Sequence, residues 1–107
     1  MGISAAVLMP YPDWDLAETR RIVLDYLAGY KVRVYLFGSH AKHTAHRTSD
    51  IDVALLPELP LPAGLLSDLR EALENSNILY HVDLVDLSFA DTGFREKVLN
   101  QGVLWSG

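Results

Sequence analysis

Apolar and polar positions alternate along the chain with two periods, which predict helices interleaved with strands. Apolar residues recur at helical spacing over 14–28, after Pro12 and Asp13, which suit a helix N-terminus, and before Gly29, which suits a helix end. β-Branched and aromatic residues fill 31–37, which predicts a buried strand. The pattern therefore predicts a helix whose apolar side packs in the core, followed by a first strand.

Later segments follow the same two periods. They predict a strand over 51–56, a helix over 63–74, a strand over 81–87, and a helix that begins at a Ser88 cap and continues to about residue 100. Asp91 stands at the capping-box position of this last helix. Alternating helices and strands predict an α/β fold, with helices packed mainly on one face of the sheet and an open acidic face for a ligand.

A Gly-Ser pair directly follows the first strand and forms a candidate phosphate-binding turn. Gly38 allows the backbone to approach a phosphate closely, and Ser39 adds a hydroxyl group. A short helix beginning here would direct free N–H groups toward negative charge. We therefore expect this pair to bind phosphate groups.

Two carboxylates, Asp50 and Asp52, begin the second strand. Strand side chains alternate between faces, so both carboxylates are expected on one face, while Ile51, Val53 and Leu55 point into the core. Two negative charges this close raise the pKa of at least one group unless a cation neutralises them. Mg²⁺ prefers such oxygen ligands together with substrate phosphates, so the pair is a candidate magnesium site.

A third carboxylate is available in the stretch His-Val-Asp-Leu-Val-Asp-Leu, which contains Asp83 and Asp86. Because these two are three residues apart, they point to opposite faces, and only one can join the first pair. Asp83 is our choice, since a strand beside Asp50 and Asp52 would present its first carboxylate next to theirs, with Leu84 turned inward. Asp86 remains the alternative.

The loop between the Gly-Ser turn and the acids carries cations and imidazoles. Lys42 and Arg47 could neutralise phosphate groups, although charged loop residues are commonly solvated. His40, His43 and His46 recur at every third position, but zinc binding would need the loop to fold around the metal, and no fourth ligand is evident nearby. A position beside a phosphate is favoured for His40 or His43.

Composition narrows the class of protein and its partners. The 107 residues fit one domain, and the absence of cysteine excludes disulfides and thiolate metal sites, so we expect a cytoplasmic setting. The apolar run Ile3–Met9 is too short for a membrane span and lacks the basic flank of a secretory signal. A net charge of −5 argues against an extensive nucleic-acid surface and favours nucleotides or a protein as partners.

Taken in order, these residues resemble the minimal nucleotidyltransferase (MNT) family, a branch of the DNA polymerase β-type nucleotidyltransferases. The matching parts are Gly38-Ser39, ten intervening residues, Asp50-Ile51-Asp52, Val82–Leu87 on a later strand, and a final helix leading into Gly102 and a short apolar strand. The resemblance covers nearly the whole chain and implies a mixed β-sheet. Ala41-Lys42-His43 departs from the Ala-Arg-Gly of many members and replaces a planar guanidinium by an ammonium.

The resemblance implies an enzyme that transfers AMP from ATP to a hydroxyl group with two Mg²⁺ ions. It assigns metal binding and catalysis to Asp50, Asp52 and Asp83, and phosphate binding to Gly38 and Ser39. Lys42, Arg47 and Ser49 complete the nucleotide-binding residues that we predict. Stand-alone MNT proteins are similar to antitoxins that add AMP to a tyrosine of a HEPN ribonuclease. A HEPN-domain protein encoded by a neighbouring gene is therefore the expected partner.

A second hypothesis is a binding module. In it, the chain is a catalytically weak nucleotide-binding antitoxin that neutralises its partner by forming a complex. The departure at Lys42-His43 motivates this hypothesis. The presence of all three acids argues against it, because a pure binder needs no metal triad.

Overall fold

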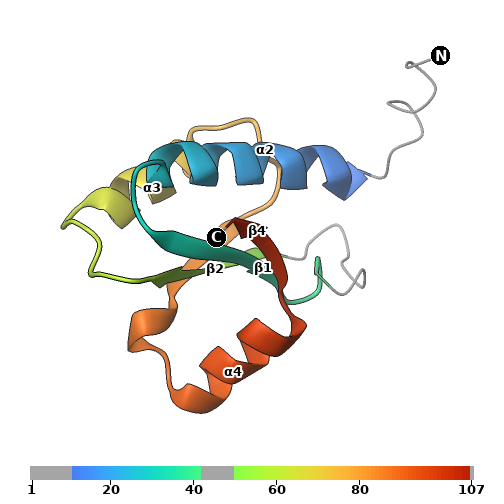
Figure 1. Cartoon of the computed structure of the whole chain (residues 1–107). Coiled ribbons are helices and arrows are strands. Elements are labelled where there is room, and N and C mark those ends of the chain that lie inside the picture. Colours follow the sequence, from blue (N-terminus) through green and yellow to red (C-terminus); the bar gives the residue numbers. More distant parts are fainter. Residues whose placement is uncertain (1–10, 42–49, 107) are drawn as a thin grey trace.

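A mixed four-stranded sheet with helices on both faces makes up the part of the chain that this computed structural model describes, residues 11–41 and 50–106 (Figure 1). The elements in chain order are α2 (Tyr11–Leu27), β1 (Val32–Phe37), β2 (Ile51–Pro57), α3 (Leu65–Glu74), β3 (Val82–Asp86), the short 3₁₀ helix η1 (Leu87–Phe89), α4 (Thr92–Gln101) and β4 (Val103–Ser106). None of these helices is long and apolar enough to cross a membrane. The predicted alternation of helices and strands is confirmed.

The strands follow the order β3-β2-β1-β4 across the sheet. β1 pairs antiparallel with both β2 and β4, whereas β2 pairs parallel with β3. A tight turn cannot join parallel strands, and the chain crosses from β2 to β3 through α3. The mixed sheet implied by the family resemblance is confirmed.

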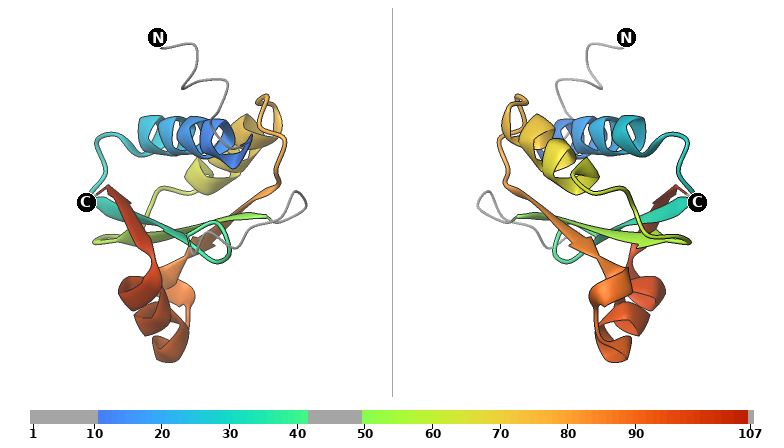
Figure 2. Two further views of the ribbon diagram at one scale, coloured as in Figure 1. Left: turned by 90° about the vertical axis from the view of Figure 1, so that its right-hand side faces the viewer. Right: turned by 90° about the vertical axis from the view of Figure 1, so that its left-hand side faces the viewer.

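Helices α2 and α3 lie together on one face of the sheet (Figures 1 and 2). The buried core on this face consists of Ile22, Val23, Leu27, Val34, Leu36, Ile51, Val53, Leu55, Leu69, Leu73 and Leu84. The three apolar residues of β2 in this set have no exposed surface. β2 therefore turns its apolar side chains toward the helices, as predicted, and leaves the alternate positions for the other face.

The other face carries η1 and α4, which lie below the sheet in Figure 1. A smaller buried core on this side consists of Tyr35, Ala54, Leu87 and Val98. Beside it, the rings of Phe37 and Phe94 meet edge to face, with their centroids 5.6 Å apart. Helices thus lie mainly on one face, as expected, but α4 also borders the face to which β2 directs its acids.

A buried carboxylate joins α2 to the loop before β3. Asp15 is 1% exposed, and its Oδ1 accepts a hydrogen bond of 3.2 Å from the backbone N–H of Leu79. From α3, Arg70 donates to the carbonyl oxygen of Leu84 at 3.3 Å. Because β3 is an edge strand with β2 as its neighbour, these two contacts help to fix its position.

The start of α2 differs from the sequence prediction. The helix begins at Tyr11, so Pro12 and Asp13 lie inside its first turn and do not precede it. Proline is tolerated there because the N–H groups of the first turn have no partner within the helix. The end at Leu27 agrees with the prediction, and Gly29 follows with a positive φ of 89°.

The start of α4 was also predicted wrongly. Asp91 is itself the N-cap of α4, and its Oδ1 accepts the N–H of Phe94 at 2.8 Å. Ser88 lies in η1, where its backbone N–H donates to Oδ1 of Asp86 at 2.8 Å. Two short aspartate caps thus divide a segment that the sequence pattern treated as one helix.

Gly102 joins α4 to β4 where the backbone passes close to β1. Its N–H donates to the carbonyl oxygen of Val98 at 2.7 Å. A Cβ at this position would lie only 2.6 Å from that same oxygen and 3.2 Å from the carbonyl oxygen of Leu36. Only glycine lets α4 approach the sheet this closely.

We predict that Gly102→Ala lowers the free energy of unfolding by about 1–3 kcal/mol, because the added methyl group overpacks a contact with backbone atoms. Gly93→Ala in the same helix is the control, since its Cβ would meet Asp91 Oδ1 at an ordinary 3.4 Å. Urea denaturation of both variants measures the difference. Equal stability of the two variants would contradict the proposed close approach.

Candidate active site

One row of side chains across the sheet brings the predicted site together. The register pairs Phe37 of β1 with Asp52 of β2, and Asp52 with Asp83 of β3. Residues opposite one another in a sheet point to the same face, and so do residues two apart along a strand, which adds Asp50. The sheet therefore gathers the three predicted acids on the face that α4 borders.

Asp86, the alternative third acid, lies elsewhere. It pairs with Leu55, three positions along β2 from Asp52. Its carboxylate accepts the Ser88 N–H at the start of η1. Of the two candidates on β3, the structure thus brings Asp83 beside Asp52 and gives Asp86 a capping position.

Gly38 contacts the carboxylate of Asp52. Its φ of +78° is in the left-handed region that favours glycine. A Cβ at Gly38 would overlap Oδ2 of Asp52 and lie 3.2 Å from its Cγ. Glycine is therefore required here both for the backbone conformation and for space. Through this contact, the turn predicted to bind phosphate lies directly against the strand that carries the acids.

The pKa of Asp52 is raised above its ordinary value. Burial is the largest cause, and the negative charges of Asp83 and Asp50 add to it. His40 and His81 act in the opposite direction. The prediction that crowding raises the pKa of at least one of these carboxylates is confirmed, although desolvation contributes more than the neighbouring charges.

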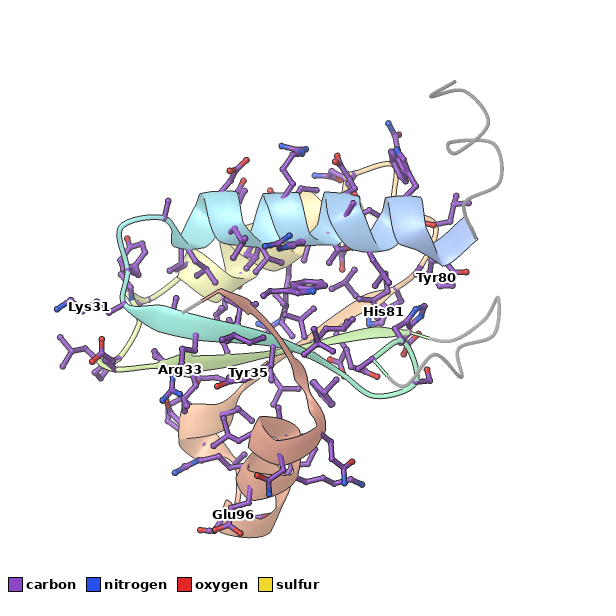
Figure 3. All side chains as sticks on the ribbon, turned by 45° about the vertical axis from the view of Figure 1, so that its right-hand side comes forward. Lys31, Arg33, Tyr35, Tyr80, His81 and Glu96 are labelled. Carbon is purple, nitrogen blue, oxygen red and sulfur yellow. The ribbon has the colours of Figure 1, made fainter. Side chains whose placement is uncertain are left out.

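His81 is a residue near the site to which the sequence analysis assigned no role. It is exposed, and its carbonyl oxygen accepts the N–H of Ile51 at 2.9 Å, where β2 begins. Figure 3 shows His81 and Tyr80 together at the end of the sheet opposite Lys31. The signal in the sequence was the spacing of two between His81 and Asp83, which places both on one face of β3.

His40, which follows the Gly-Ser pair, is buried and does not face solvent. It is 4% exposed, and its ring packs edge to face against Tyr80, with centroids 5.1 Å apart. A position beside a phosphate was predicted for His40 or His43. The burial of His40 favours a supporting role for it, and His43 lies outside the described residues.

The oxygen ligands at this end of the sheet suit a hard cation. Among the described side chains, no three His, Cys, Asp or Glu residues form a group that could hold a metal ion by themselves. Mg²⁺ does not need such a group, because it usually binds through one or two carboxylates and keeps water and substrate phosphates as further ligands. A cation would also relieve the crowding that raises the pKa of Asp52. The donors present therefore fit Mg²⁺ bound together with a nucleotide.

Several predicted nucleotide-binding residues lie outside the part of the chain that the structure describes. They are Lys42, Arg47 and Ser49, and His46 lies there too. Gly38 and Ser39 are among the described residues, and both are half-buried. Gly38 lies next to Asp52. Phosphate binding by these five predicted residues stays a prediction.

Comparison with known proteins identifies a family and relatives that this chain resembles. Residues 24–105 match the family "Polymerase beta, Nucleotidyltransferase". The probable protein adenylyltransferase MntA of Haemophilus influenzae is 34% identical over 84 residues, which cover 78% of this chain and 72% of that protein. The protein adenylyltransferase MntA of Shewanella oneidensis is 41% identical over 73 residues, which cover 67% of this chain and 52% of that protein.

A solved structure shows the same fold. It contains the tri-AMPylated Shewanella oneidensis HEPN toxin in complex with MNT antitoxin. The matched chain has a TM-score of 0.64 and 28% sequence identity, and the alignment covers 89% of this chain and 71% of that one. The predicted fold class and the resemblance to the MNT branch are thereby confirmed.

We predict that Gly38→Ala destabilises the protein more than Gly29→Ala does. Both residues have positive φ, so each substitution costs about 1–2 kcal/mol of backbone strain. Nothing lies within 4 Å of a Cβ at Gly29, whereas a Cβ at Gly38 displaces the Asp52 carboxylate. Urea denaturation compares the stability of the two variants. Addition of Mg²⁺–ATP should raise the Tm of the Gly29→Ala variant only. Equal responses of both variants would refute the link between turn and strand.

Asp52→Asn is expected to stabilise the protein by a few degrees in Tm at neutral pH without metal or nucleotide. A raised pKa means that the folded state binds the Asp52 proton more tightly than the unfolded state, so stability falls as pH rises through the folded pKa. The substitution removes this loss. The gain should fade as pH falls below about 4, because the carboxyl group then becomes protonated in the unfolded state as well as in the folded state. Thermal unfolding across pH checks this, and a pH-independent gain would rule out the raised pKa of Asp52 as its cause.

Proposed function

The chain belongs to the polymerase β-type nucleotidyltransferase family, and from this premise we propose that it transfers AMP from ATP to a tyrosine hydroxyl of a HEPN toxin, as that toxin's antitoxin. Its MntA relatives are named protein adenylyltransferases, and the similar solved structure contains an AMPylated HEPN toxin. A cytoplasmic location is part of the proposal and is compatible with a chain that contains no cysteine.

The alignment of acids and turn is the observation that carries this proposal. Asp52 lies opposite Asp83 across two parallel strands and against the backbone of Gly38 on its other side. Carboxylates suited to a cation are thus in contact with a turn suited to phosphates. That combination supports a substrate with several linked phosphate groups whose charge a divalent cation would neutralise.

The turn holds the end of the nucleotide that departs. Backbone N–H groups at Gly38 and the hydroxyl of Ser39 bind the β- and γ-phosphates, and Lys42 and Arg47, which follow in the sequence, add positive charge. Ser49, which precedes Asp50 in the sequence, contributes a further hydroxyl. These contacts stabilise pyrophosphate as it leaves.

Asp50 and Asp52 would hold two Mg²⁺ ions, with Asp83 as a further ligand. Bound there, Mg²⁺ would neutralise negative charge on the phosphate oxygens. The acids lie on one face of the sheet, so the attacking hydroxyl and the leaving pyrophosphate can be aligned on opposite sides of the α-phosphorus. Alignment and charge neutralisation supply most of the rate increase in reactions of this class.

Asp83 receives the proton of the attacking hydroxyl. The tyrosine oxygen forms a bond to the α-phosphorus, the bond from this phosphorus to the bridging oxygen breaks, and pyrophosphate leaves with that electron pair. Asp83 is exposed, unlike Asp52, so an acceptor can reach it. Its proton passes on to solvent after transfer.

The test is incubation with α-labelled ATP, Mg²⁺ and the HEPN protein encoded by the neighbouring gene, followed by the intact mass of each chain. Asp83→Asn should slow AMP transfer by about 10²–10⁴-fold, the usual effect of losing a general base. Asp86→Asn is the matched control on the same strand and should leave transfer unchanged, because Asn preserves the η1 cap.

A second variant separates catalysis from complex formation. The double substitution Asp50→Ala, Asp52→Ala should abolish the added AMP mass while the two proteins still co-elute on size exclusion. If the double variant still neutralised the toxin and the wild type transferred no AMP, the chain would instead be an antitoxin that acts by binding alone.

A further inference from the structure

A cavity of about 190 Å³ lies between the end of β1 and α4. It is lined by Phe37, Gly38, Phe94, Lys97, Val98 and Gln101. The four α4 residues in this set follow the spacing i, i+3, i+4, i+7, so they form one face of the helix. The cavity is thus built from two rigid elements.

This cavity borders the row of acids directly. Phe37 is the register partner of Asp52 and points to the same face, and neighbouring strands are about 5 Å apart. Gly38 forms part of the cavity wall and also touches the Asp52 carboxylate. A nucleotide whose α-phosphate lies at Asp52 can therefore reach the cavity with its nucleoside on the Phe37 side, while its β- and γ-phosphates stay at the Gly38-Ser39 turn.

Its size and lining suit a planar heterocycle. The volume is smaller than the roughly 300–1,000 Å³ of sites that enclose a whole drug-sized ligand, so it accommodates one part of a nucleotide. The rings of Phe37 and Phe94 stand edge to face at 82°, which offers an aromatic surface to a stacked base. Gln101 and Lys97 contribute the polar groups at its border.

Gln101 is the residue best suited to distinguish one base from another. Its amide has one acceptor and two donor positions, and Gln pairs with adenine through two hydrogen bonds in other recognition sites. The lysine ammonium is a donor only, so it can donate to a ring nitrogen of adenine but cannot accept from the N6 amino group.

The other hollows near the sheet fit a base less well. The groove of about 450 Å³ lined by the Pro57–Pro62 segment and Phe89 lies at the opposite end of β2 from Asp52. The hollow of about 270 Å³ beside β3 is lined by Arg70, Leu73 and Glu74 of α3, which lies on the opposite face of the sheet from α4.

We propose that the cavity between Phe37–Gly38 and α4 receives the nucleobase of the nucleoside triphosphate, with Gln101 as the group that selects adenine. This inference rests on the proposed nucleotide transfer and adds the residues that bind and select its substrate. It assigns base recognition to the last turns of α4, on the side of the acids opposite β3.

Calorimetry on the full chain with Mg²⁺ tests the proposal. It measures the affinity for non-hydrolysable ATP and GTP analogues and for tripolyphosphate. Gln101→Ala should weaken binding of the ATP analogue by about tenfold, narrow the difference between ATP and GTP analogues, and leave tripolyphosphate binding unchanged. Phe94→Leu should weaken both nucleotide analogues. Glu96→Gln is the control, because Glu96 lies at the outer side of α4, away from the sheet (Figure 3).

The proposal would be overturned if Gln101→Ala and Phe94→Leu bound the ATP analogue as tightly as the wild type does, or if the wild type bound no nucleotide. It would also be overturned if these variants bound the ATP analogue normally but had a higher KM for the HEPN partner, since the cavity would then hold the acceptor ring. Failure of the proposed transfer is a separate result, because the binding measurements require no reaction. Retained nucleotide binding without AMP transfer would leave base recognition supported and the transfer refuted.

Discussion

The parallel pairing of β2 with β3 is the constraint on which the site depends. The register that sets Asp52 opposite Asp83 also sets Val53 opposite Leu84, and both of these apolar residues belong to the core under α2 and α3. A slip of one residue would turn Asp83 toward α2 and α3, and it would turn Leu84 toward the face that carries the acids. The packing of an apolar core on one face therefore determines the spacing of charged groups on the other.

That arrangement is held at an energetic disadvantage. Asp52 is partly buried beside two other carboxylates, and its raised pKa expresses the unfavourable free energy of its charge. The fold maintains this position through contacts outside the row of three acids, including the Gly38 turn and the hydrogen bond between Asp15 and Leu79 before β3. Sites that bind cations and anionic substrates commonly accept such a local loss, because ligand binding reverses it.

Much of this architecture follows from short-range rules of the sequence. The period of two placed Ile51 and Asp52 on opposite faces, and the positive φ of Gly29 ended α2 as expected. Longer-range features did not follow. The sequence pattern merged η1 with α4, since it could not show whether Ser88 or Asp91 caps a helix. The cavity beside Gly38 was also missed, because its lining depends on how α4 docks and not on any local period.

The crossover through α3 also determines when the site appears during folding. β1 and β2 are antiparallel neighbours along the chain, whereas β3 reaches its place only after α3 has crossed the sheet. Contacts between distant segments form slowly, because loop closure precedes them. We therefore expect Asp83 to join Asp50 and Asp52 late in folding. A ligand bound between them stabilises contacts absent from early folding states, so it lengthens the lifetime of the folded protein more than it accelerates folding.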